Sequence, residues 1–115
     1  MNVLIKRVYE PASSGDGLRV LVDRLWPRGL SKEQASIDLW VKELAPSTQL
    51  RRWFHSADGN WLEFKKRYRQ ELSERRDEAW ALQSRIGDQK VTFLYATKAE
   101  DHNHAQLLKA FLERL

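Results

Sequence analysis

Residues 23–29, with the sequence DRLWPRG, bring several reactive side chains into one short stretch. A carboxylate, two guanidinium groups and an indole lie on a loop that is stiffened by proline. Arginine offers the paired, planar hydrogen bonds that phosphates and carboxylates accept. We predict that Arg28 binds an anionic ligand beside Trp26, and that Asp23 is a candidate general base. Arg24 is a candidate for the same ligand, although pairing with Asp23, which would only fix the loop, is its favoured role.

A second reactive string, TKAEDHNHA, lies near the C-terminus and contains two of the three histidines. If Asp101 caps the following helix, His102 and His104 stand two helical positions apart and point to opposite sides. That spacing argues against one metal ion shared by both. The start of a helix also disfavours the imidazolium form, which leaves a neutral histidine to act as a base or a hydrogen-bonding group. The alternative is one histidine satisfied in the core and one exposed.

Within this second string, His104 is the candidate general base and Lys98 is expected to stabilise developing negative charge. His102 and Asn103 are candidate ligand contacts. The sequence implies no particular cofactor and no metal site, because it contains no cysteine and none of the motifs GxxxxGK[ST], GxGxxG or HExxH.

Two further clusters are interpreted as structural. In LRRWFH, at residues 50–55, arginine, tryptophan and histidine stand together as they do where bases or sugars stack. We expect instead that Trp53 and Phe54 lie in the core and that the arginines face solvent. The run KKR at residues 65–67, with Arg69, could contact phosphates, but a solvated helix face is the favoured interpretation.

The apolar pattern predicts the elements that carry these strings. Strands are predicted where Val, Ile, Phe and Tyr cluster or alternate, at residues 3–9, 19–25, 37–41 and 90–96. Helices are predicted from caps and from apolar residues three and four apart, at residues 31–35, 47–54, 60–72, 74–86 and 107–115.

A continuous apolar strand followed by a helix is typical of a parallel sheet. We therefore predict one small three-layer α/β domain over residues 1–115, with a four-stranded, mostly parallel sheet flanked by helices. Ligands of such sheets bind outside the carboxyl ends of the strands. Both reactive strings fall at such ends.

Composition limits the class of protein. The chain has 115 residues, 42% of them hydrophobic and 31% charged, with a formal net charge of +4. No apolar run is long enough for a membrane span, and the start of the chain does not look like a secretory signal, so we expect a cytoplasmic protein. The positive charge favours an anionic small molecule or a nucleic acid as partner. It does not predict the oligomeric state.

Five strings together carry a family resemblance: VDRLWPRG, DLWVKELAPS, LRRWF, WLEFKKRY and VTFLYATKAEDHNHAQLL. They resemble the short, YeaO-like branch of the bacterial domain-of-unknown-function family 488, and the resemblance covers essentially the whole chain. A longer branch of that family has Asp-Val-Arg and then Pro after its second strand, which Asp23, Arg24 and Pro27 resemble. It has Cys-His-Arg after its last strand, where this chain has Asn103 and His104. Since an amide cannot act as a thiolate, the resemblance implies no thiol chemistry here.

Three functions follow from these features. The first is an enzyme acting on a small phosphorylated or nucleotide-like ligand, held by arginines, with Asp23 or His104 as base. The second is a non-catalytic nucleic-acid- or anion-binding accessory module, in which tryptophan and arginine stack on bases and contact phosphates. The third is a structural or protein-interaction domain. The first requires that Asp23, Arg28 and His104 share one site.

Overall fold

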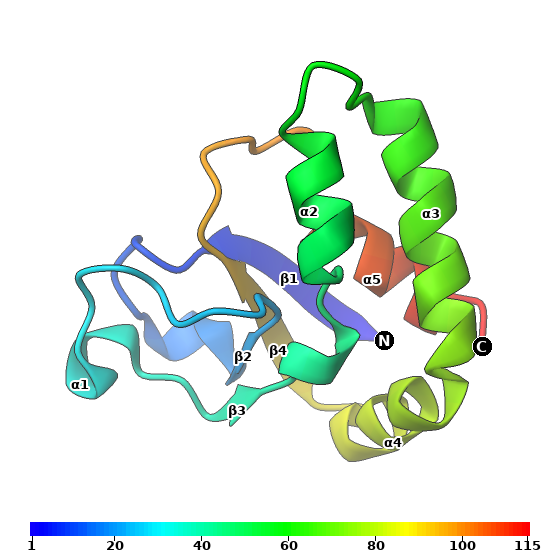
Figure 1. Cartoon of the computed structure of the whole chain (residues 1–115). Coiled ribbons are helices and arrows are strands. Elements are labelled where there is room, and N and C mark those ends of the chain that lie inside the picture. The colour runs from blue at the N-terminus through cyan, green and yellow to red at the C-terminus, as the bar shows by residue number, and fades with distance from the viewer.

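A single parallel sheet organises the molecule, and the computed structural model describes all 115 residues. Its strands are β1 (Asn2–Arg7), β2 (Leu18–Leu21), β3 (Leu39–Trp40) and β4 (Lys90–Tyr95), in the spatial order β1-β4-β2-β3. Every neighbouring pair is parallel, which confirms the predicted α/β class. Because β4 lies between β1 and β2, the last strand of the chain brings its following loop beside the loop after β2 (Figure 1).

All four strands are shorter than predicted, and the difference is largest for β2 and β3. β2 ends at Leu21, although Val22 still donates a backbone hydrogen bond to the carbonyl of Leu94. At the next residue of the strand, the N–H of Ala96 donates to the side-chain carboxylate of Asp23, at 3.0 Å. The carboxylate therefore replaces the backbone carbonyl that would accept this hydrogen bond in a longer strand. β3 has only two residues and is followed, after Val41, by the short 3-10 helix η2 (Lys42–Leu44).

Five helices complete the fold: α1 (Lys32–Ala35), α2 (Thr48–Phe54), α3 (Trp61–Glu74), α4 (Arg76–Ile86) and α5 (His104–Glu113). The predicted caps Ser31 and Ser47 each accept a hydrogen bond from a backbone N–H in the first turn. The condition considered for the last helix, that Asp101 caps it, is not met. Asn103 caps α5 instead, and the helix therefore begins earlier than its apolar spacing indicates.

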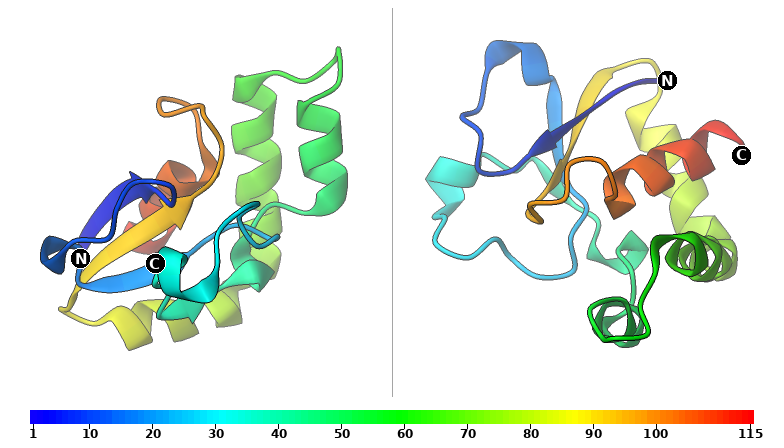
Figure 2. Two further views of the ribbon diagram at one scale, coloured as in Figure 1. Left: turned by 90° about the vertical axis from the view of Figure 1, so that its left-hand side faces the viewer. Right: turned by 90° about the horizontal axis from the view of Figure 1, so that it is seen from above.

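Helices cover the two faces of the sheet unequally. Val91, Phe93 and Tyr95 of β4 point into the larger core, which packs against α3, α4 and α5. Leu94 points to the other face, where a smaller cluster with Leu21 lies under α1 and its neighbouring loops. The alternation is what an extended strand dictates, and the three layers are a thick helical layer, the sheet and a thin cover (Figure 2).

A buried ion pair between Asp16 and Arg19 holds α1 against the sheet. The short turn η1 (Ser14–Asp16) places Asp16 beside the guanidinium of Arg19, which also donates to the carbonyls of Ala35 and Ser36 at the end of α1. Burial alone would raise the pKa of Asp16. Hydrogen bonds from Ser13, Lys6 and Arg19 outweigh it and hold that pKa well below its usual range.

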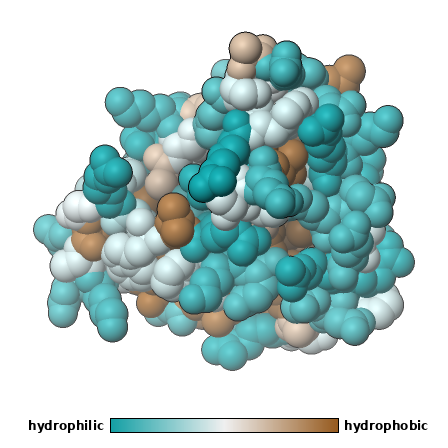
Figure 3. Space-filling model, viewed as in Figure 1, coloured by the Kyte–Doolittle hydropathy of each residue, from teal (hydrophilic) through white to brown (hydrophobic).

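α2 and α3 form a pair that projects past the carboxyl ends of the strands (Figures 1 and 2). The face seen in Figure 3 is largely hydrophilic, with hydrophobic residues scattered over it. None of the helices combines the length and the apolar character that crossing a bilayer requires.

Candidate functional site

A cleft of about 680 Å³ opens at the carboxyl ends of β2 and β4. Its walls are the loop after β2, the loop after β4 and the facing parts of α2 and α3. All three histidines line it, together with three arginines and a single carboxylate: His55, His102, His104, Arg24, Arg28, Arg51 and Asp23. Asp23, Arg28 and His104 therefore line one cleft, which the sequence could only assume.

Asp23 and His104 are in direct contact inside the cleft. Oδ1 of Asp23 lies 2.7 Å from Nε2 of His104, and both side chains are mostly buried. Neither atom has another polar partner, and the contact lies off the direction of the imidazole N–H bond, so it is a close polar contact rather than an aligned hydrogen bond. With its other oxygen on the N–H of Ala96, Asp23 joins the ends of β2 and β4.

Arg24 and Trp26 hold the loop after β2 in place. The guanidinium of Arg24 donates to the carbonyls of Ala45 and Pro46, both at 3.1 Å, rather than to Asp23. The indole of Trp26 donates to the carbonyl of Leu30. The single N–H of the Trp26 indole and two of the five N–H donors of Arg24 are thus used within the protein, and these contacts fix the loop as a wall of the cleft.

Arg28 differs from its neighbours in this loop. Its carbonyl accepts a hydrogen bond from the hydroxyl of Tyr9, at 2.8 Å, which fixes the backbone. Its guanidinium is exposed, lines the cleft and makes no hydrogen bond or ion pair within the protein. The chain thus anchors the main chain of Arg28 and leaves the charge free.

The candidate site residues of the loop after β4 lie in different surroundings. Asn103 is 2% exposed, and its amide donates to the carbonyls of Ala99 and Glu100 while its oxygen caps α5. His102 stacks on Trp61, with ring centroids 4.8 Å apart and planes 11° apart. Lys98 is exposed and does not line the cleft.

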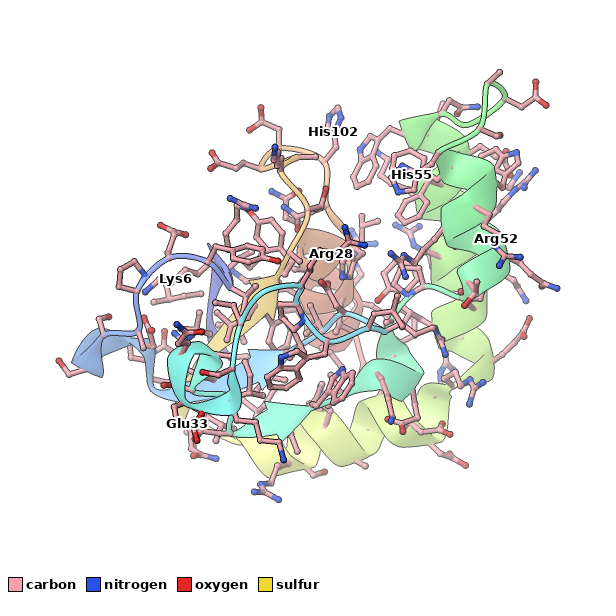
Figure 4. The ribbon with its side chains drawn as sticks, turned by 60° about the vertical axis from the view of Figure 1, so that its left-hand side comes forward. Lys6, Arg28, Glu33, Arg52, His55 and His102 are labelled. Carbon is pink, nitrogen blue, oxygen red and sulfur yellow. The ribbon has the colours of Figure 1, made fainter.

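Sequence reasoning missed the contribution of α2. Trp53 and Phe54 do pack against the core, as predicted. Arg51 and His55, however, line the cleft, while Arg52 is exposed and points away from it (Figure 4). The spacing of four residues between Arg51 and His55 places both on one helix face, and this was the available signal.

Electrostatics of the cleft are dominated by cations. Arg51, like Arg28, has no ionic partner, and Asp23 is the one carboxylate that lines the walls. Beneath the cleft, the ring of Tyr68 meets that of His104 edge to face. Burial, together with the carboxylates of Glu71 and Asp23, raises the pKa of Tyr68, so its hydroxyl stays neutral and donates to the carbonyl of Leu44.

Imidazole and carboxylate groups do not gather into a metal centre. His102 stacks on Trp61 and His104 contacts Asp23, so the two histidines of the second string serve different partners. No three side chains of the ligating types come together in a way that could hold an ion.

Comparisons with known proteins identify relatives over the full length. A family described as "Inactive DUF488-N3 subclade" matches residues 2–115. The Escherichia coli (strain K12) protein titled "Uncharacterized protein YeaO" is 43% identical over 115 residues, which are the whole of both chains. An "uncharacterized protein" of Mycobacterium tuberculosis (strain H37Rv) is 39% identical over 110 residues, covering 96% of this chain and 92% of its own. No solved structure matches the chain significantly.

Proposed function

The chain belongs to the DUF488 family, and from this premise and the geometry of the cleft we propose that it binds a small phosphorylated ligand without converting it. The ligand lies at the carboxyl ends of β2 and β4, the usual binding position of an open parallel sheet. The cleft volume of about 680 Å³ is in the range that such ligands occupy.

One observation carries the proposal: Arg28 and Arg51 enter the same cleft from different elements, and neither guanidinium has a partner in the protein. Two cations that share a cleft repel each other, and an anion between them relieves that repulsion. Arginine binds phosphate with paired hydrogen bonds, which gives direction as well as charge. We therefore assign the phosphate to these two residues.

The aromatic wall supports a nucleotide-like ligand. His102 stacks on Trp61 at one side of the cleft, and Figure 4 shows His55 and His102 on the same side of the molecule as Arg28. Flat rings of this kind bind bases by stacking. We expect a mononucleotide to bind more tightly than inorganic phosphate alone.

Binding without turnover is favoured because the candidate catalytic groups either make structural contacts or lie outside the cleft. One carboxylate oxygen of Asp23 binds the N–H of Ala96 and so joins two strand ends, and the other lies against the imidazole of His104. Lys98 stands outside the cleft walls. The family description "Inactive DUF488-N3 subclade" agrees with this assignment.

Thermal unfolding in the presence of ligands tests the binding proposal. The probes are inorganic phosphate, a ribose phosphate, mononucleotides, and short DNA and RNA. At one hundred times its dissociation constant a ligand adds about 2.7 kcal/mol, a shift of roughly 10 °C in a domain of this size. We expect a mononucleotide to produce this shift in the wild type and the Arg28→Ala/Arg51→Ala variant to lose it.

The matched control removes the same charge elsewhere. Arg52 and Arg85 are exposed and do not line the cleft, so Arg52→Ala/Arg85→Ala is expected to keep the shift. Equal loss in both double variants would mean that only net charge matters, and the cleft would not be the site. A response to DNA or RNA alone, falling steeply with salt, would replace the small ligand by nucleic acid.

A second candidate function, acid–base catalysis, rests on the contact between Asp23 and His104. The carboxylate lies 2.7 Å from Nε2 of His104, and Nδ1 of His104 makes no hydrogen bond within the protein, which leaves it available as a general base. Incubation with mononucleotides and sugar phosphates, followed by analysis of products, distinguishes the two functions. Turnover that His104→Ala abolishes would replace the binding proposal by an enzyme.

A further inference from the structure

A second groove, separate from the cleft, lies between α3, the start of α4 and the end of α5. It measures about 200 Å³ and shares no residue with the cleft. Half of its ten lining residues are hydrophobic. We call it the basic groove, after the four cations that line it: Lys65, Arg69, Arg76 and Arg114.

Charge in the basic groove is uncompensated. None of its four cations forms an ion pair, and no acidic side chain lines it. Arg67 pairs with Glu63 on α3 and Arg75 pairs with Glu78 on α4, whereas Lys66 on α3 is unpaired like the four cations of the groove. The groove is therefore distinguished by the gathering of four unpaired cations around one set of apolar residues. Binding a negatively charged partner would relieve the repulsion among the four.

The floor of the groove is apolar. It is formed by Leu72, Leu107, Ala110, Phe111 and Leu115. All but Leu72 are partly exposed to solvent. An apolar floor inside a charged rim is the usual composition of a protein interface, in which a buried anchor is surrounded by polar contacts. A nucleic-acid backbone would satisfy the rim but would leave this floor uncovered.

We propose that the basic groove docks an acidic segment of a partner protein. Carboxylates of that segment pair with the cations of the rim, and one bulky apolar side chain fills the floor. Charge complementarity sets the rate and the selectivity of such docking, while the apolar anchor limits dissociation. The basic groove shares no residue with the proposed ligand cleft, so the docking proposal and the ligand proposal are tested separately.

Fluorescence anisotropy with a short labelled peptide tests the docking. The probe combines several glutamates with one leucine or phenylalanine, and the comparison peptide carries glutamine in place of every glutamate. We expect saturable binding of the acidic peptide that weakens as salt is added. We expect binding of the glutamine peptide to be at least about tenfold weaker.

Charge reversal locates the site. Arg69→Glu/Arg114→Glu is expected to weaken the acidic peptide by about tenfold or more. Lys66→Glu/Arg85→Glu makes the same change in net charge at exposed cations of α3 and α4 outside the groove. It is expected to change the affinity by less than about threefold. Arg69→Gln/Arg114→Gln, with a smaller effect in the same direction, replaces the reversal if that variant is unstable.

Three results would overturn the proposal. One is the absence of saturable peptide binding to the wild type. Another is an equal loss in the two charge-reversed variants, which would show attraction to net charge alone. The third is tighter binding of a short DNA duplex than of the peptide, lost in Arg69→Glu/Arg114→Glu, which would make the groove a nucleic-acid surface.

Discussion

Removing the charge of Asp16 is expected to destabilise the protein strongly. Its side chain is 6% exposed and that of Arg19 is 5% exposed, so Asp16→Asn leaves a guanidinium buried without its counter-charge. Breaking a buried pair from one side costs about 3–5 kcal/mol. We expect about 3 kcal/mol, the lower limit, because asparagine keeps an oxygen that accepts from Ser13. At about 4 °C per kcal/mol this lowers the melting temperature by roughly 12 °C.

The lowered pKa of Asp16 also makes the free energy of unfolding depend on pH. Because its pKa in the folded state lies below the ordinary value of 3.8, the folded state binds the proton less readily than the unfolded state. The charged carboxylate therefore contributes stability above about pH 4. That contribution falls as the pH is lowered below the unfolded-state value toward the folded one. The difference in unfolding free energy between wild type and Asp16→Asn is expected to shrink below pH 4.

Urea denaturation at several pH values, followed by tryptophan fluorescence, measures both effects. Asp58→Asn is the control, since Asp58 is exposed and makes no hydrogen bond or ion pair, and it is expected to change stability by less than about 0.5 kcal/mol. A loss below about 1 kcal/mol for Asp16→Asn at neutral pH would refute the reasoning. The reasoning would also be refuted if the difference in unfolding free energy between wild type and Asp16→Asn stayed constant down to pH 2.

Two other substitutions test the packing beneath the cleft and a close backbone approach at the amino ends of β2 and β4. Tyr68→Phe removes the buried hydroxyl that donates to the carbonyl of Leu44 and is expected to cost about 1–2 kcal/mol in thermal or urea unfolding. Tyr95→Phe is its control, because the hydroxyl of Tyr95 makes no hydrogen bond within the protein, and an equal loss would contradict the assignment. Gly17→Ala is expected to cost more than about 2 kcal/mol, because φ is +65° and the new Cβ would lie 2.2 Å from the carbonyl oxygen of Lys90. Gly15→Ala, whose Cβ would meet nothing closer than 3.8 Å, is expected to be nearly neutral; similar melting temperatures for the two variants would show that the clash is relieved.

The elements of the fold follow from local patterns in the sequence. The strand at 90–96 and the apolar stripe of α3 match strongly periodic segments, and the caps Ser31 and Ser47 match their local signals. Errors fall at boundaries that side chains decide. Asn103 and Asp101 are both good caps by residue type, and in the folded chain Asn103 caps α5 while its amide also donates to the carbonyls of Ala99 and Glu100.

The candidate site divides in the same way. Residue type and position after a strand were enough to predict Asp23, Arg28 and His104 as candidate site residues. Their spatial relation depended on the order of the strands, because β4 lies next to β2 only in the folded sheet. For Arg24 the sequence favours a pair with Asp23 over a ligand contact. Its actual partners are two carbonyls more than twenty residues away in the chain.

The sequence by itself determined the α/β class, the parallel sheet and the two loops that form most of the cleft, because periodicity, turn residues and strand ends are local properties. The tertiary structure alone decided which charges remain free. Whether a guanidinium is available depends on carbonyls and carboxylates brought near it by folding. This separated Arg28 and Arg51 from Arg24 and Arg19, and it exposed four unpaired cations around one apolar floor.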